Sequence, residues 1–149
     1  MNSAESRFPE DSFADVLQAN ERFVENFQDS DLTGYARQGL AIVTCMDSRI
    51  DPLAVVGMKA GDVKILRNAG ARVTEDVLRT LVLATHLLGV ERVLVMPHTE
   101  CRMASGEEAD VHASILEASG IDTRSLEIRT AIDQVGALKS DVKIGRAHV

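Results

Sequence analysis

Two short apolar runs constrain the fold of this chain more strongly than any other feature of the sequence. Residues 40–44 are apolar without the alternation of a half-exposed strand, and residues 92–96 form a second, mostly apolar run. Such runs are typical of strands that are covered on both faces of a parallel sheet. Each run is followed closely by one of the two cysteines of the chain, Cys45 and Cys101. Ligand sites in open parallel sheets lie beyond the carboxyl ends of the strands, so the two thiols are expected to meet there.

Predicted helices alternate with predicted strands along the chain. The expected elements are a helix at 12–27, a strand at 40–44, a short helix at 51–58, a strand at 62–67, a helix at 74–88, a strand at 92–96, a helix at 107–118 and an amphipathic stretch at 125–139. Alternation of this kind is typical of βαβ units. The predicted fold class is therefore α/β, with three α/β/α layers around a mostly parallel central sheet whose strand ends carry the functional site.

Two of the predicted helices raise the question of what covers their apolar residues. The helix at 74–88 begins at a capping threonine and ends before Gly89, and its apolar residues cover most of its circumference. We therefore expect this helix to be largely buried. The helix at 12–27 carries three of the four phenylalanines in one stripe, which packs either on the core of the chain itself or on a partner subunit.

Length and composition limit the classes of function. With 149 residues the chain is expected to form one domain, with an N-terminal helical arm at 1–39, a core at 40–120 and a C-terminal helix and tail at 121–149. A net charge of -7 argues against a nucleic-acid or membrane partner. No apolar run approaches the roughly 20 residues that span a bilayer, and the N-terminus lacks the apolar core of a signal peptide. We expect a cytoplasmic protein, in which cysteines stay reduced.

A histidine joins the two cysteines in the predicted site. His98 and Cys101 are three residues apart, so one tight turn can present both to a single ion. Two cysteines and one histidine form a catalytic zinc set, in which the fourth position stays open for water or substrate. Other interpretations are weaker, because a Cys45–Cys101 disulfide is disfavoured in the cytoplasm and the spacings fit neither a cysteine phosphatase nor a thioredoxin-like site. Two inert buried cysteines would leave His98 unexplained.

A carboxylate and a guanidinium follow the first cysteine at alternate positions. Residues two apart project to the same side of an extended chain. If the extended geometry persists beyond the strand, Cys45, Asp47 and Arg49 converge on one small volume. An ordinary structural ion pair between Asp47 and Arg49 is the alternative interpretation.

Three motifs together resemble the β-class carbonic anhydrases of the small prokaryotic type. In chain order they are Cys45-Met46-Asp47-Ser48-Arg49, Ile65-Leu66-Arg67-Asn68-Ala69-Gly70 and His98-Thr99-Glu100-Cys101. The resemblance covers roughly residues 12–118. It implies a zinc-dependent lyase that reversibly hydrates carbon dioxide to bicarbonate and a proton by a zinc-bound hydroxide. It also implies that Cys45, His98 and Cys101 bind Zn²⁺, and that the chain forms a homodimer or a dimer of dimers.

The same resemblance implies roles for Asp47 and Arg49. Asp47 would accept a hydrogen bond from the zinc hydroxide, and Arg49 would hold Asp47 ionised and in place. In some family members this aspartate is instead a fourth zinc ligand in a closed resting form. Candidates for lining the carbon dioxide site are Val73, Leu78, Val82 and the backbone of residues 68–70.

Two alternative functions and two departures from the family pattern accompany this hypothesis. A hydrolase of carbonyl sulfide or carbon disulfide would use the same site, and a non-catalytic zinc-binding or bicarbonate-sensing homologue would keep the ligands without turnover. Many relatives have glycine directly after the second cysteine, where this chain has Arg102. The family fold also continues into a further strand and helical segment, so the end at Val149 predicts a shortened C-terminus and an incomplete sheet edge.

Overall fold

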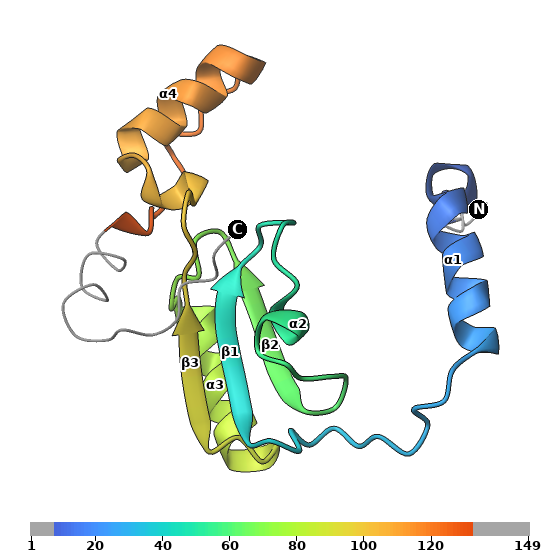
Figure 1. Cartoon of the computed structure of the whole chain (residues 1–149). Helices are drawn as coiled ribbons and strands as arrows, with labels where there is room; N and C mark the ends of the chain where they lie inside the picture. Colours follow the sequence, from blue (N-terminus) through green and yellow to red (C-terminus); the bar gives the residue numbers. More distant parts are fainter. Residues whose placement is uncertain (1–7, 133–149) are drawn as a thin grey trace, which may run out of the picture. The chain divides into compact units, whose positions relative to one another are not determined.

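The computed structural model describes residues 8–132 of the chain, which divides into two units, residues 1–33 and 34–149. The first unit contains a short 3-10 turn, Glu10–Phe13, followed by the helix α1, Ala14–Glu25 (Figure 1). No residue of α1 is buried, and two phenylalanines of its apolar stripe, Phe23 and Phe27, contact each other with ring centroids 5.6 Å apart. The predicted helix therefore begins slightly later than expected. That its apolar stripe packs on the core of the chain or on a partner subunit stays a prediction.

The second unit is built on a parallel sheet of three strands. These are β1, Leu40–Cys45, β2, Val63–Asn68, and β3, Arg92–Met96, in the order β2-β1-β3 (Figure 1). Every residue of the central strand β1 is buried. In the register of the sheet, Cys45 lies opposite Asn68 of β2, and Thr44 lies opposite Met96 of β3. The expected central strand and its parallel neighbours are confirmed.

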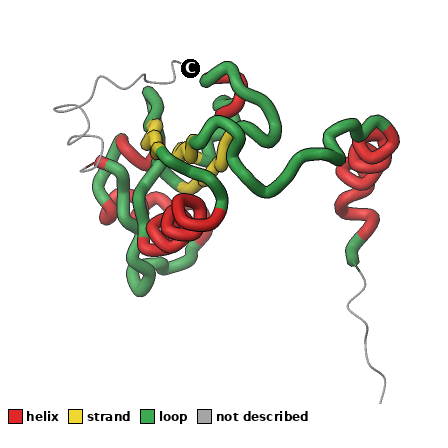
Figure 2. Tube along the Cα trace, turned by 90° about the horizontal axis from the view of Figure 1, so that it is seen from below, coloured by secondary structure: helices red, strands yellow, loops and turns green. Residues whose placement is uncertain are grey.

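The sheet has a covered surface on each side. On one side Ile42 packs with Ile50 and Met96, beside the short helix α2, Pro52–Val55, which the Asp51 carboxylate caps. On the other side Ala41 packs with Ala84 of the helix α3, Glu75–Leu87. Figure 1 shows α3 behind the sheet, and Figure 2 shows the strands nearly end-on with α3 alongside them. Successive residues of β1 serve opposite faces, as a doubly covered strand requires. The α/β fold with flanking helices is confirmed.

The prediction that the helix at 74–88 is largely buried is wrong for this chain. Thr74 caps α3 as expected by accepting from the backbone N–H of Val77, but only Val77 and Ala84 of the helix are buried. Large side chains on its outer side are exposed, at 53% for Leu78, 56% for Val82 and 61% for Leu87. The sheet covers one side of α3, and no described element covers these outer side chains.

The last described helix is α4, Glu108–Ser119, which ends at Gly120 in a left-handed conformation. The helix predicted at 125–139 does not begin at 125, since residues 125–131 form turns and irregular backbone and Ile132 is the first helical residue there. Backbone groups there bond outside the segment, with the N–H of Ile128 donating to Glu108 and that of Ala131 donating to the carbonyl of Met103. The remainder of that prediction, like the shortened C-terminus, falls on residues 133–149, outside the described residues. None of the described helices has the length and apolarity to cross a lipid bilayer.

Candidate metal centre

The structure brings Cys45, His98 and Cys101 together at the carboxyl ends of two neighbouring strands. Cys45 is the last residue of β1, and the other two lie in the loop that follows β3. One donor atom from each residue lies within 4.8 Å of the others, and all three residues are buried. The two sulfur atoms are 3.9 Å apart. Because β1 and β3 are neighbours in the sheet, their carboxyl ends together produce a compact donor cluster.

The free nitrogen of His98 points to a missing partner. Its Nδ1 lies 2.8 Å from the backbone carbonyl of Thr99, which can only accept, so Nδ1 carries the proton. Nε2 then has a lone pair that is free to bind a metal ion. Nε2 is the one fully buried side-chain nitrogen or oxygen without a hydrogen-bond partner in the described part of the chain. Buried polar atoms are rarely left unsatisfied, because each one carries the full penalty of losing water. A metal ion bound to Nε2 would remove this penalty.

Backbone amides approach both sulfur atoms of the cluster. The N–H of Gly70 donates to Sγ of Cys45 at 3.3 Å. Burial raises the pKa of Cys101, while the backbone amides of Met103 and Ala104 act in the opposite direction. Thiols bind metal ions as thiolates, so groups that favour the negative sulfur also favour a bound metal.

Asp47 and Arg49 form a well-aligned ion pair beside the cluster. The guanidinium donates from Nε to Oδ1 at 3.0 Å and from Nη2 to Oδ2 at 2.8 Å, and the backbone N–H of Arg49 donates to Oδ1 at 2.9 Å. These hydrogen bonds hold the pKa of Asp47 well below its usual range, and those from the guanidinium have the largest effect. Oδ2 of Asp47 lies 3.7 Å from Nε2 of His98. An ionised carboxylate therefore stands at the edge of the donor cluster, where it can only accept hydrogen bonds.

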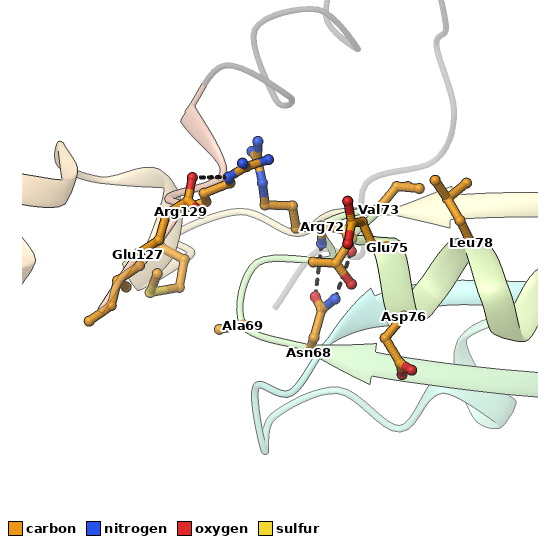
Figure 3. Close-up of a pocket in the computed structure, with 12 residues that line it drawn as sticks. Asn68, Ala69, Arg72, Val73, Glu75, Asp76, Leu78, Glu127 and Arg129 are labelled. Atoms are coloured by element: carbon orange, nitrogen blue, oxygen red, sulfur yellow. Dashed lines mark hydrogen bonds and ion pairs between the residues drawn. The ribbon is translucent and has the colours of Figure 1, made fainter. Parts of the chain in front are cut away.

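A pocket of about 760 Å³ lies next to the loop that follows β2 (Figure 3). It is lined by this loop, the start of α3 and residues 127–129. Val73 and Leu78, two of the predicted lining residues, face it together with Asn68 and Ala69. Val82 is not among its lining residues, and neither are the side chains of the donor cluster. The lining of a carbon dioxide site therefore stays a prediction.

Several residues that shape the site were not identified from the sequence as its components. Arg67 of β2 donates to the backbone carbonyls of Cys45 and Asp47, at 2.8 and 2.7 Å, and so fixes the end of β1. Glu100 has its carboxylate 3.7 Å from Arg49 and a left-handed backbone with φ of 54°. Arg102, at the position where the resemblance predicts glycine, is exposed at the start of a 3-10 turn. Hydrogen bonds to backbone atoms leave no pattern in a sequence, so these contacts could not be read from it.

Comparison with known proteins gives the same assignment from sequence and from structure. Residues 40–145, more than half of the chain, match the family model of the carbonic anhydrases. Beta-carbonic anhydrase 1 of Mycobacterium tuberculosis is 39% identical over 82 residues, which cover 55% of this chain and 50% of that protein. A carbon disulfide hydrolase of Acidithiobacillus thiooxidans is 35% identical over 92 residues, which cover 60% of this chain and 45% of that protein. The chain thus spans about half the length of these curated relatives.

The solved structures agree with the sequence relatives. The crystal structure of carbonic anhydrase from Streptococcus mutans matches with a TM-score of 0.73 and 30% identity, over 88% of this chain and 82% of that chain. Since the family match begins at the first residue of β1 and extends past the donor cluster, it includes every residue of the candidate site. The chain belongs to the carbonic anhydrase family, in its β class.

Proposed function

We propose that this protein catalyses the zinc-dependent, reversible hydration of carbon dioxide to bicarbonate and a proton. The observation that carries the proposal is the buried cluster of Cys45, His98 and Cys101, whose histidine nitrogen Nε2 has no hydrogen-bond partner among the residues that the structure describes. Family membership supports the same activity, because the donor cluster lies within the matched residues.

The donor set fits zinc better than the other common metals. Two cysteine sulfurs and one imidazole nitrogen suit Zn²⁺, whereas magnesium and calcium prefer oxygen ligands. In our proposal Cys45, His98 and Cys101 hold the ion and leave its fourth position open. Zinc bound in this way acidifies a water molecule, which supplies a nucleophile near neutral pH.

Asp47 and Arg49 are proposed to orient the reacting groups. Because the pKa of Asp47 is held low by Arg49, its carboxylate is ionised at neutral pH and accepts a hydrogen bond from the nucleophile. Through such a hydrogen bond, Asp47 would orient the nucleophile toward carbon dioxide. Arg49 holds the carboxylate through two parallel hydrogen bonds, an arrangement that restricts rotation of the carboxylate. A turn of Asp47 onto the metal would give the closed state, in which the aspartate is the fourth ligand.

A metal analysis combined with stopped-flow measurement of carbon dioxide hydration tests the proposal. We expect one zinc ion per chain and hydration activity, and we expect Asp47→Asn to retain zinc and lose the activity. Asp122→Asn is a matched control, because Asp122 has the same paired hydrogen bonds with Arg124 but is not part of the donor cluster. Full activity in Asp47→Asn would exclude the role of this carboxylate, and a chain without stoichiometric zinc would contradict the whole proposal.

A second candidate activity is the hydrolysis of carbon disulfide or carbonyl sulfide. It is favoured by the relative from Acidithiobacillus thiooxidans, whose identity to this chain is close to that of the carbonic anhydrase relative. Both activities would use the same metal-activated nucleophile on a linear molecule. Turnover numbers measured side by side with each substrate separate the two. Zinc binding without turnover of any of them would instead favour a zinc-binding or bicarbonate-sensing role.

A homodimer, or a dimer of dimers, belongs to the same proposal. Its support is the apolar surface that the described residues leave uncovered on α1 and α3, including Phe23, Val24, Val82 and Leu87. Light scattering of the purified chain measures the assembly directly, and a monomer would contradict this part of the proposal. We also propose a cytoplasmic location, because two thiol ligands stay reduced there.

A further inference from the structure

The loop after β2 presents a backbone amide to one sulfur of the donor cluster. The N–H of Gly70 donates to Sγ of Cys45 at 3.3 Å, and this hydrogen bond is buried. Gly70 has a φ of 91° and its neighbour Ala71 a φ of 57°. Two successive residues with positive φ are unusual, and the φ of Gly70 sets the orientation of the peptide group whose N–H donates to Cys45. Side-chain hydrogen bonds span this loop from Asn68 to Arg72.

Asn68 supplies these hydrogen bonds. Its Oδ1 accepts from the backbone N–H of Arg72 at 2.8 Å, and its Nδ2 donates to the backbone carbonyl of Arg72 at 2.6 Å (Figure 3). The backbone of Asn68 lies opposite Cys45 in the sheet, and its carbonyl accepts from the N–H of Met46 at 2.8 Å. One residue therefore closes the loop through its side chain and attaches the loop to the end of β1 through its backbone.

The other side of the loop is closely packed. A Cβ atom on Gly70 would lie 2.7 Å from Cβ of Ala131 and 3.1 Å from Cβ of Met103. Ala131 is fully buried, and its N–H donates to the carbonyl of Met103 at 2.7 Å. The Gly70 amide is thus held between this packing and the sulfur of Cys45. A small change in the loop would lengthen the N–H···S hydrogen bond.

The chemistry of a zinc site with two thiolates gives this hydrogen bond a purpose. Thiolates donate more negative charge to a metal than imidazoles do, which makes a bound water less acidic. A hydrogen bond to sulfur withdraws part of that charge, as it does in other metal–thiolate sites whose properties depend on such bonds. The Gly70 amide is aimed at the sulfur of Cys45, so it acts on the charge of a ligand atom itself.

We propose that Asn68 is a positioning residue, which holds the Gly70 amide on the sulfur of Cys45 and so limits the charge that Cys45 gives to a bound metal. The inference rests on the proposed zinc site. Asn68 itself acts at a distance, because both polar atoms of its side chain bond to the backbone of Arg72. A merely structural role would affect folding but would leave the electronic state of the sulfur unchanged.

The cobalt-substituted full chain reports on this electronic state through its sulfur-to-cobalt charge-transfer absorption. Loss of the hydrogen bond raises the energy of the sulfur electrons, so Asn68→Ala is expected to move this band to longer wavelength. Zinc affinity, measured by chelator competition, is expected to fall about tenfold. Asn26→Ala is the matched control, since it removes a similar bond, from Asn26 Nδ2 to the carbonyl of Arg22, in the separate N-terminal unit. The control should leave both quantities unchanged, and an unmoved band in Asn68→Ala would overturn the inference.

The unaltered protein provides a second test, which does not depend on the folding of a variant. With an NMR-active cadmium isotope in the site, the amide proton of Gly70 is expected to show scalar coupling to cadmium across the hydrogen bond to Cys45. Cadmium bound through Cys45 without this coupling would overturn the inference alone. A chain that binds no stoichiometric metal, or binds it without Cys45, would overturn the proposed function as well, so the two failures are distinguishable.

Discussion

Replacing Gly70 by alanine tests how tightly the loop beside Cys45 is packed. Gly70 has a φ of 91°, and a Cβ atom there would lie 2.7 Å from Cβ of Ala131. Two separate effects should lower the free energy of unfolding. Alanine in a left-handed conformation costs about 1–2 kcal/mol. Forcing a methyl group into a packed site costs about 1–3 kcal/mol more. The expected loss of stability is therefore about 2–5 kcal/mol.

A second substitution separates these two effects. Ala131→Gly removes the methyl group that the new Cβ would strike, and by itself it should cost about 1 kcal/mol for the lost buried methyl. In the double variant the clash disappears and the backbone strain remains. The double variant should therefore be about 1–3 kcal/mol more stable than the sum of the single changes predicts.

Urea unfolding followed by circular dichroism, with and without added zinc, measures all four members of this cycle. The zinc-free series reports packing and backbone strain without a contribution from the metal to the free energy of unfolding. Two results would refute the reasoning. One is a loss below about 0.5 kcal/mol for Gly70→Ala, which is the size of an ordinary surface change. The other is additivity of the two substitutions within about 0.5 kcal/mol.

Three further predictions concern charge, metal and capping. Because the folded pKa of Asp47 is depressed by Arg49, the contribution of this pair to stability is complete above the unfolded pKa near 3.8 and is lost as the pH falls from there toward the lower folded value. The free energies of unfolding of the wild type and Arg49→Met, measured as a function of pH, should therefore differ at neutral pH and converge in acid. A difference in this free energy that persists in acid would contradict the prediction. Chelation of zinc should lower the melting temperature, because His98 Nε2 then loses its partner. If free zinc was at 100 times its Kd before chelation, the lost stabilisation is about 2.7 kcal/mol. An unchanged melting temperature would exclude zinc at this site. Thr74→Ala should lower the free energy of unfolding by about 1 kcal/mol through loss of the α3 cap, and Thr74→Ser should restore most of it.

The parts of the fold that could be predicted are those that local sequence encodes. The apolar run of β1 identified a strand covered on both faces, since covering the two faces requires apolar residues at successive positions. Thr74 marked the start of α3 through its side chain, and Gly89 marked its end through its backbone freedom. The residues of the donor cluster could be named because only a few residue types bind metals. The two cysteines lie at, or soon after, the ends of two strands that end side by side.

The parts that could not be predicted depend on partners far away in the chain. Exposure of Leu78 and Val82 was missed because an apolar helix surface has the same sequence pattern whichever molecule covers it. The irregular backbone at 125–131 was missed because its hydrogen bonds go to Glu108 and Met103, which an amphipathic pattern cannot reveal. The role of Arg67 was missed because it binds carbonyl oxygens, and every residue has one.

The strand order explains why the site forms at this point of the sheet. Cys45 ends the central strand β1, opposite Asn68 of β2 and one residue beyond the pair of Thr44 with Met96 of β3. The loop after β3 contributes donor atoms, through His98 and Cys101, and β2 with its loop contributes hydrogen bonds to the end of β1. Donors and hydrogen bonds thus come from opposite sides of one strand. A change in the β2 loop can therefore alter the charge on a ligand without moving the two ligands on the β3 side, and this separation makes the effect of Asn68 measurable.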